Sequence, residues 1–339
     1  MKLQDQFPTV NPGLIFNTIS GYMSSQILKS GLDFDVFTHI AEGKTSVADI
    51  AHATGTNPRA MRYLLDALTG LNFLSKPSPH TYSITPISKM YLVKHNPFHF
   101  GFINRTVEFS WKPWGQLSEV IKTGKPVETE EVPEDLFKEL SAYFFSVNHP
   151  IAIALTDTLE VGKSWKGFHL LDIASGAAAW SIAFAQRDPR IRVTANDFPK
   201  VLEVTKQFTE RFGVAHQYTY LEGSTHEVDF GSGLFDAAII GNYCHIEGES
   251  YNRALFKKVS RALRNGGKIL IADMIADEDR STATYALNFA VGMLIKSEEG
   301  DAFTLSQFKT WLEESNFKDV ELMEFPGPVS VIQAVKETP

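Results

Sequence analysis

The sequence predicts a mainly α winged-helix domain followed by an α/β domain with a mainly parallel, doubly wound sheet of the Rossmann type. Two observations predict this fold class. From residue 167 onward, short apolar runs of strand character alternate with amphipathic segments, the pattern of parallel strands joined by helices. Residues 1–100 instead show helical segments followed by two short β-rich runs, an order typical of a winged helix-turn-helix. We therefore expect a winged-helix domain at 1–100, a helical bridge at 101–160 and the α/β domain at 161–339.

Local signals place the elements of the winged-helix domain. Apolar side chains recur at helical spacing over residues 14–28, which predicts one continuous helix. Ser46 and Asp49 stand at capping-box spacing and predict the start of a short helix. Pro58 suits the first turn of the helix that follows. The two β-rich runs then form a small hairpin of residues 73–75 and 81–84.

The α/β domain shows six candidate strands separated by helical segments. The strands are expected at His169–Ile173, Arg192–Asn196, Tyr218–Glu222, Ala237–Gly241, Lys268–Asp273 and Val329–Val335, with helices such as Val201–Phe212 and Tyr251–Leu263 between them. In sheets of this kind the ligand binds at the carboxyl ends of the strands, near the switch in strand order. Functional residues are therefore sought where the strands end.

Composition excludes several classes of protein. The formal net charge is −8, which argues against a general binder of nucleic acid or of anionic membranes. Cys244 is the only cysteine, so neither an intramolecular disulfide nor a cysteine-based metal cluster is possible, and the scattered histidines predict no metal site. The chain contains neither an apolar run of about 20 residues nor a signal peptide, and we expect a cytoplasmic protein.

The segment from residue 170 to residue 200 is the strongest functional signal. It predicts a strand, a turn of small residues at Gly176, a helix, a second strand and then Asp197. The acid follows the glycine by about twenty residues, the spacing of a nucleotide-binding βαβ unit in which a carboxylate meets ribose hydroxyls. Ala178 stands where a second glycine is usual and costs conformational freedom if the turn needs a positive φ.

These features nominate a set of cofactor-binding residues at the strand ends. They are Asp172, Ala174, Gly176, Asp197, Phe198, Gly223, Ser224 and Asn242. The competing interpretation is structural: a tight turn that binds nothing, an N-cap at Asp197 and an ordinary loop serine at Ser224. The position of the acid after the second strand favours the ligand-binding interpretation.

His245 is the candidate catalytic base, because it follows the fourth strand and neutral imidazole accepts protons near pH 7. A lone histidine is more often a loop or cap residue, but this one stands where a reacting group is expected. Asp273, at the end of the fifth strand, and Asp301 are the candidates for orienting the histidine or the substrate. Together with the βαβ unit, this arrangement favours an S-adenosylmethionine-dependent methyltransferase.

Motifs along nearly the whole chain carry a family resemblance. They lie at residues 27–35, 83–86, 114–117, 123–126, 171–173, 196–199 and 263–271. On these motifs the chain resembles the small-molecule O-methyltransferases that join an N-terminal winged-helix dimerisation domain to a class I methyltransferase domain. Plant caffeate and hydroxyindole methyltransferases and bacterial natural-product enzymes belong to this group.

The resemblance implies a function and a site. The cofactor is S-adenosylmethionine, with Gly176 in its turn, Asp197 on its ribose and His245 as the general base. The partner is a second copy of the chain, joined through the N-terminal domain. The acceptor is a small molecule with a hydroxyl group, and flat aromatic or polyketide-like acceptors suit the aromatic walls. Its candidate contacts are Trp111, Phe145, Asn148, Asn288 and Met293.

Two departures from the family pattern keep alternatives open: Ala178 replaces the second glycine, and Ile246 follows the histidine where an acid or a second histidine is common. One alternative keeps the fold and the cofactor pocket but performs an isomerisation, cyclisation or hydroxylation, which product mass distinguishes. The other is a ligand-sensing winged-helix regulator that contacts phosphates through Arg59 and Arg62. The identity of the acceptor, and O-, N- or C-methylation, remain open at this stage.

Overall fold

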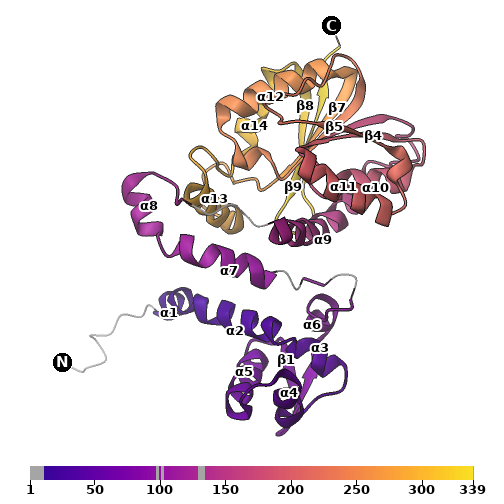
Figure 1. Ribbon diagram of the computed structural model, residues 1–339. Helices are drawn as coiled ribbons and strands as arrows, with labels where there is room; N and C mark the ends of the chain where they lie inside the picture. Colours follow the sequence, from indigo (N-terminus) through magenta and orange to yellow (C-terminus); the bar gives the residue numbers. More distant parts are fainter. Residues whose placement is uncertain (1–10, 97–98, 101–102, 129–133, 339) are drawn as a thin grey trace, which may run out of the picture. The chain divides into compact units, whose positions relative to one another are not determined.

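The computed structural model describes residues 11–96, 99–100, 103–128 and 134–338 of the chain (Figure 1). The chain forms two compact units, Met1–Ser110 and Trp111–Pro339. The boundary between them falls inside one helix, α7 (Ile103–Trp114). Among the described residues, no helix has both the length and the apolar character that crossing a bilayer requires.

The first unit has the predicted order of helices followed by a hairpin. Its elements are α1 (Gly13–Ile19), α2 (Gly21–Asp33), α3 (Val36–Ala41), α4 (Val47–Thr54), α5 (Pro58–Gly70), β1 (Leu74–Ser78), β2 (Thr81–Ile84) and α6 (Pro86–Tyr91). The prediction of one helix over residues 14–28 was wrong, because the chain breaks at Ser20 between α1 and α2. Periodicity alone did not show this break, since apolar spacing continues across it.

The helix starts follow from capping chemistry. Ser46 Oγ accepts the amide of Asp49 at 3.1 Å, and Asn57 Oδ1 accepts the amide of Arg59 at 2.9 Å ahead of Pro58. These bonds satisfy amides that have no carbonyl partner within their own helix. The apolar face of α5 packs into the core of the unit through Met61, Leu65 and Leu68.

The first two helices present apolar side chains that their own chain leaves uncovered. Leu14, Ile15, Phe16 and Ile19 on α1 are 79%, 68%, 64% and 71% exposed. Tyr22 and Met23 on α2 are about half exposed. A contiguous apolar surface of this kind is typical of a protein–protein contact.

The second unit is built on a seven-stranded sheet of order β5-β4-β3-β6-β7-β9-β8. Its strands are β3 (His169–Ile173), β4 (Arg192–Asp197), β5 (Tyr218–Glu222), β6 (Phe235–Gly241), β7 (Leu263–Asp273), β8 (Phe317–Met323) and β9 (Ser330–Lys336). The first five strands in this order are parallel, and β9 alone runs in the opposite direction, antiparallel to both β7 and β8, which confirms the mainly parallel doubly wound sheet. The sequence did not predict β8, an edge strand whose charged, exposed residues lack the apolar pattern of the inner strands.

Helices cover both faces of this sheet (Figure 1). On one face they are α9 (Glu134–Thr158), α10 (Ala179–Arg187), α11 (Pro199–Arg211) and α13 (Thr284–Lys296), and on the other α12 (Glu249–Ala262) and α14 (Leu305–Glu313). The short helix α8 (Leu117–Thr123) contacts α13 rather than the sheet. Successive strand residues alternate between two cores: Leu170 and Ile239 pack with α9, α10 and α11, whereas Leu171 and Ile240 pack with α12 and α14. Burial on both faces leaves the strand ends as the place where polar side chains gather.

Candidate active site

The turn after β3 contains three residues in the left-handed backbone conformation. Ala174, Gly176 and Ala178 have φ values of 53°, 54° and 56°. The amide of Ala178 donates to the carbonyl of Ser175 at 2.7 Å, and that of Ser175 donates to the carbonyl of Asn196 on β4 at 3.0 Å. Ala178 thus adopts the backbone shape of the usual glycine, although its Cβ disfavours that shape.

The end of β4 is bonded directly to this turn. Asp197 Oδ2 accepts the amide of Gly176 at 2.9 Å, and its Oδ1 accepts the amide of Phe198 at 2.8 Å. Burial raises the pKa of Asp197, while the two amides lower it. A Cβ built on Gly176 would have no atom within 4 Å, so the space above the turn is open. The structure therefore brings Asp197 and Gly176 together, and the side chain of Phe198 beside them is 57% exposed.

Asp172 lies below the turn rather than on its surface. Its carboxylate is 2% exposed and accepts the hydroxyl of Ser181, which in turn accepts the hydroxyl of Tyr218 at 2.9 Å. Burial raises the pKa of Asp172 to about 7, although the Ser181 hydroxyl lowers it. This carboxylate supports the start of α10 from within the core, a role that its position at the end of a strand did not reveal.

Gly223 and Ser224 form the loop after β5. The amide of Gly223 donates to the carbonyl of Asp197 at 3.0 Å, which joins this loop to the end of β4. Ser224 Oγ accepts the amide of His226 at 3.2 Å, so the serine also shapes its own turn. Asn242, after β6, has a φ of 56°, and its Oδ1 accepts the indole NH of Trp180 at 3.4 Å. These residues thus lie side by side at the carboxyl ends of strands β3 to β6.

His245 and Asp273 form a buried pair at the ends of β6 and β7. Nδ1 of His245 lies 2.6 Å from Asp273 Oδ1, and the backbone amide of His245 donates to Oδ2 at 3.1 Å. The amide of Met274 also donates to Oδ1, at 2.8 Å. A carboxylate at Nδ1 fixes the tautomer in which Nδ1 carries the hydrogen and Nε2 keeps its lone pair. Within the described part of the chain, Nε2 makes no hydrogen bond, so it is available as a base.

Asp301 does not orient His245 through its side chain. Its carboxylate pairs with Arg280 at 2.9 Å, and only its backbone amide reaches the histidine residue, donating to the carbonyl of His245 at 3.0 Å. The guanidinium of Arg280 can form this ion pair because both side chains lie in loops at the protein surface. Of the two acids nominated from the sequence, the structure places Asp273 on the imidazole.

The five residues nominated for the acceptor fall into different environments. Phe145 is 7% exposed and packs against Phe208 and Phe212 of α11 at ring centroid distances of 4.8 Å, so it is a core residue rather than an open wall. Asn148 is 4% exposed, and its Oδ1 has no hydrogen-bond partner among the described residues. The other three lie on the helices α7 and α13, where Trp111 and Asn288 are exposed and Met293 is half-buried.

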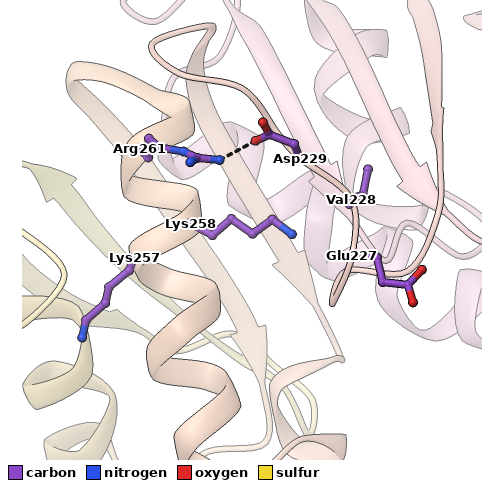
Figure 2. A pocket seen from close by; sticks show the side chains of 6 residues that line it. All are labelled: Glu227, Val228, Asp229, Lys257, Lys258 and Arg261. Atoms are coloured by element: carbon purple, nitrogen blue, oxygen red, sulfur yellow. Dashed lines mark hydrogen bonds and ion pairs between the residues drawn. The ribbon is translucent and has the colours of Figure 1, made fainter.

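Two surface cavities of the second unit are lined neither by the nominated cofactor residues nor by His245 and Asp273, although the second one includes Asp301. One of about 410 Å³ is lined by Glu227, Val228, Asp229, Lys257, Lys258 and Arg261 (Figure 2). Two of its three cationic side chains are already engaged: Arg261 pairs with Asp229, and Lys258 Nζ donates to the carbonyl of Thr225 at 2.9 Å. The other, of about 570 Å³, is lined by Gly248, Glu249, Ser250, Arg253, Glu299, Asp301, Phe303 and Gln307. We assign neither cavity a role in the chemistry.

Comparison with known families decides what this arrangement belongs to. Residues 16–94 match the O-methyltransferase dimerisation domain. Residues 138–318, more than half of the chain, match the O-methyltransferase domain. The chain belongs to the O-methyltransferase family.

Known proteins align with this O-methyltransferase over almost its whole length. It is 28% identical over 337 residues to the tetracenomycin polyketide synthesis 8-O-methyltransferase of Streptomyces glaucescens, covering 94% of each chain. It is 24% identical over 343 residues to the 3-hydroxy-5-methyl-1-naphthoate 3-O-methyltransferase of Streptomyces sahachiroi, covering 96% of this chain and 95% of that one. Human N-acetylserotonin methyltransferase, solved in complex with S-adenosylmethionine, shares the fold with a TM-score of 0.83 at 22% identity, covering 98% of this chain and 100% of that one.

The methyltransferase is S-adenosylmethionine-dependent, and its strand-end residues fit that cofactor. Ser175, in the first turn, is 9% exposed, and its Oγ has no hydrogen-bond partner among the described residues. Buried polar atoms are rarely left unpaired, so this hydroxyl is suited to a bound polar group. Open space above Gly176 and the adjacent Asp197 carboxylate provide room and an acceptor for ribose hydroxyls.

Sequence reasoning missed several residues that build this site. Thr205 Oγ1 donates to the carbonyl of Gly176 at 2.7 Å and so ties α11 to the turn. Trp180 fills the space beside β6, where a Cβ on Gly241 would lie 2.2 Å from the indole. Ser181 and Tyr218 hold Asp172. No short motif announces such contacts, because each joins residues that are distant in the sequence.

Proposed function

We propose that this methyltransferase transfers a methyl group to a hydroxyl of a small aromatic or polyketide-derived molecule, with His245 as the general base. The pairing of His245 with Asp273 carries the proposal. It places an imidazole with a free Nε2 at the carboxyl ends of β6 and β7, beside the strand ends that fit the cofactor.

His245 and Asp273 have different roles in the proposed methyl transfer. When bound, S-adenosylmethionine supplies a methyl group on a sulfonium, which is a good leaving group. His245 Nε2 would accept the proton of the acceptor hydroxyl that receives the methyl group. Asp273 faces the imidazolium that results and stabilises its charge at 2.6 Å. Because a phenol has a pKa of about 10 and an imidazole about 6.5, complete proton transfer before methylation is unfavourable, and the base shares the proton while the developing negative charge is consumed.

Four residues are proposed to hold the cofactor directly. Asp197 accepts the ribose hydroxyls, while the amide and open space at Gly176 let the backbone approach closely. The unpaired Ser175 hydroxyl meets a polar group of the amino-acid tail. The exposed ring of Phe198 offers an apolar face to the adenosyl group. Ala174, Gly223, Ser224 and Asn242 shape the turns around this position.

The acceptor is proposed to lie within the second unit, against α9, α13 and the last residues of α7 from Trp111 onward. Phe289 of α13 meets the imidazole of His245 edge-on, with ring centroids 4.7 Å apart, so this helix lies beside the base. Asn288 and Met293 belong to the same helix. The unpaired Oδ1 of Asn148 is suited to a polar group of the acceptor, and Trp111 to its flat surface. The names of the two Streptomyces relatives, one a polyketide-synthesis enzyme and the other a methyltransferase of a hydroxynaphthoate, support a flat acceptor and a role in secondary metabolism.

The family of the first unit supports a dimer. We infer that the exposed apolar residues of α1 and α2 are covered by a second copy of the chain, which makes the protein a homodimer through its N-terminal domain. A cytoplasmic location remains a prediction of the sequence.

The proposed function is tested first at the cofactor. Calorimetric titration with S-adenosylmethionine and S-adenosylhomocysteine should show binding that is lost in Asp197→Ala. Wild-type protein, cofactor and hydroxynaphthoate probes should then give a product heavier by one CH₂ unit. An unshifted product mass with bound cofactor would instead favour a non-methylating reaction.

The base is tested by two substitutions. His245→Ala should lower the rate by roughly 10²–10⁴-fold, the usual contribution of a general base. Asp273→Asn keeps the shape of the side chain, but an amide nitrogen at Nδ1 favours the wrong tautomer and should also lower the rate at least about 100-fold. A near-normal rate for His245→Ala would remove this residue from the mechanism.

A further inference from the structure

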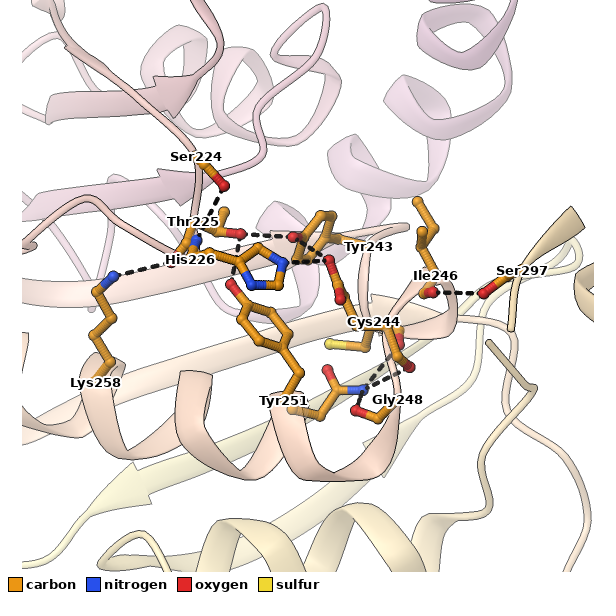
Figure 3. Close-up of polar contacts among 12 residues, drawn as sticks. Ser224, Thr225, His226, Tyr243, Cys244, Ile246, Gly248, Tyr251, Lys258 and Ser297 are labelled. Atoms are coloured by element: carbon orange, nitrogen blue, oxygen red, sulfur yellow. Dashed lines mark hydrogen bonds and ion pairs between the residues drawn. The ribbon is translucent and has the colours of Figure 1, made fainter. Parts of the chain in front are cut away.

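A chain of hydroxyl groups joins the loop after β5 to the turn that carries His245 (Figure 3). Tyr251 of α12 donates to Thr225 Oγ1 at 2.6 Å. Thr225 Oγ1 lies 2.6 Å from the hydroxyl of Tyr243, and that hydroxyl donates to Glu247 Oε1 at 2.7 Å. Since Tyr243 has one hydroxyl hydrogen and gives it to Glu247, Thr225 is the donor in the middle bond.

A second side chain of the loop after β5, that of His226, also bonds to Glu247 at the end of this hydroxyl chain. His226 Nε2 lies 3.1 Å from Glu247 Oε1, and its ring stacks on Tyr251 with the centroids 3.8 Å apart. Thr225 is 6% exposed, and burial raises the pKa of both Tyr243 and Tyr251, so the two phenols remain protonated donors. The hydroxyls of Thr225 and Tyr243 are each both a donor and an acceptor, an arrangement in which neighbouring bonds strengthen one another.

The two joined segments belong to the two halves of the proposed site. Thr225 and His226 directly follow Gly223 and Ser224, which are proposed to shape the cofactor position. Tyr243 precedes His245 by two residues, and Glu247 follows it by two residues. The hydroxyl chain therefore holds the base-carrying turn on both sides of the histidine.

Other bonds fix each segment to the rest of the fold, but not the two to each other. Asn252 Nδ2 donates to the carbonyls of Cys244, Glu247 and Gly248, and Ser297 Oγ donates to that of Ile246 (Figure 3). On the other side, Lys258 holds the carbonyl of Thr225. The loop after β5 and the turn of His245 are linked by the hydroxyls of Thr225 and Tyr243 and by Glu247, whose carboxylate accepts from both Tyr243 and His226.

We propose that Thr225 and Tyr243 are positioning residues for the methyl transfer, setting the base-carrying turn of His245 against the cofactor-side loop through Glu247. The inference rests on the proposed function, because it assigns the two hydroxyls to the placement of the general base. Neither residue needs to touch the acceptor. Their effect passes through the backbone of residues 243–247, so a loss of either hydroxyl should lower turnover more than binding.

The test compares three near-isosteric substitutions. Thr225→Val removes the central hydroxyl, and Tyr243→Phe removes the one that donates to Glu247. Tyr220→Phe is the matched control. It removes a phenol hydroxyl of the same unit that lies 3.1 Å from Thr209 Oγ1 and is not part of the hydroxyl chain from Tyr251 to Glu247. With a hydroxynaphthoate acceptor, the first two should lower kcat by roughly 10- to 100-fold, the cost of a slightly misplaced catalytic group. The KM for S-adenosylmethionine should change less than about threefold, and Tyr220→Phe should match wild type.

A second background separates positioning from general destabilisation. When His245 is already alanine, Tyr243→Phe should change the residual rate by less than about twofold, because the two residues act through one group. Equal losses with and without His245, or unchanged kcat in both hydroxyl variants, would overturn the inference.

A measurement without turnover keeps the two proposals apart. Hydrogen exchange of the amides of Ile246 and Glu247 should be faster in Thr225→Val than in Tyr220→Phe, with or without S-adenosylhomocysteine. If wild type transfers no methyl group, the proposed function fails, and this exchange comparison alone decides whether the loops are coupled. Equal exchange in the two variants would contradict the coupling whatever the enzyme does.

Discussion

Ala178→Gly tests whether the turn after β3 is strained, and its effect on stability can be worked out from the structure. Ala178 has φ 56° and ψ 33° and is fully buried. An L-residue in this left-handed conformation costs roughly 1–2 kcal/mol, which glycine does not pay. Against this gain, glycine loses about 0.8 kcal/mol for one buried methyl group and about 0.4–1 kcal/mol through the greater freedom of the unfolded chain. The free energy of unfolding should therefore change by less than about 1 kcal/mol.

Ala183→Gly is the matched control within the same helix. Ala183 is 1% exposed and lies in the interior of α10, where its backbone is unstrained. Glycine there loses about 1 kcal/mol of helix propensity and about 0.8 kcal/mol of methyl burial, so the free energy of unfolding should fall by about 2 kcal/mol. The two variants thus differ by about 1–2 kcal/mol only if the left-handed turn is real.

Urea unfolding of the intact chain, followed by tryptophan fluorescence, measures both variants. Calorimetry with S-adenosylhomocysteine should give affinities for Ala178→Gly within about twofold of wild type, because the turn already has the shape that glycine would allow. Equal destabilisation by the two substitutions would refute the strain argument. A large gain in affinity for Ala178→Gly would show instead that the alanine holds the turn away from its binding shape.

Two further outcomes are expected. Because burial raises the pKa of Asp172 to about 7, the folded protein keeps a proton that the unfolded chain releases near pH 4, so this group makes stability fall as the pH rises from about 4 to about 7. Asp172→Asn should flatten that part of the pH dependence in urea unfolding, and an unchanged slope would show that another group is responsible. Sedimentation at micromolar concentration should give a dimer for wild type and a monomer for Leu14→Glu combined with Ile15→Glu, and a monomeric wild type would contradict the proposed interface.

The sequence alone determined the fold class and the local elements of this protein. The strands β3 and β5 begin and end at the predicted residues, because β3 is a buried apolar run and β5 is rich in the aromatic and β-branched residues typical of strands. Capping at Ser46 and Asn57 was equally local. His245, Gly176 and Asp197 were nominated because each lies at or within a few residues of the carboxyl end of a strand, and parallel strands have these ends on the same side of the sheet.

Contacts between residues far apart in the sequence could not be predicted from these local patterns. The sequence offered Asp273 and Asp301 as equal partners for His245, and only the pairing of β6 with β7 brought Asp273 to the imidazole while Arg280 took Asp301. Phe145 was assigned to a pocket wall, because aromatic composition does not distinguish a core ring from an exposed one.

Backbone shape and polar networks were likewise decided by the tertiary structure. The positive φ of Ala178 is imposed by the joining of β3 to α10, against the preference of the residue itself. The hydroxyl chain from Tyr251 to Glu247 joins residues of α12 and of two separate loops. Periodicity and capping depend on neighbours within one or two turns, whereas these features depend on which strand ends the folded sheet places side by side.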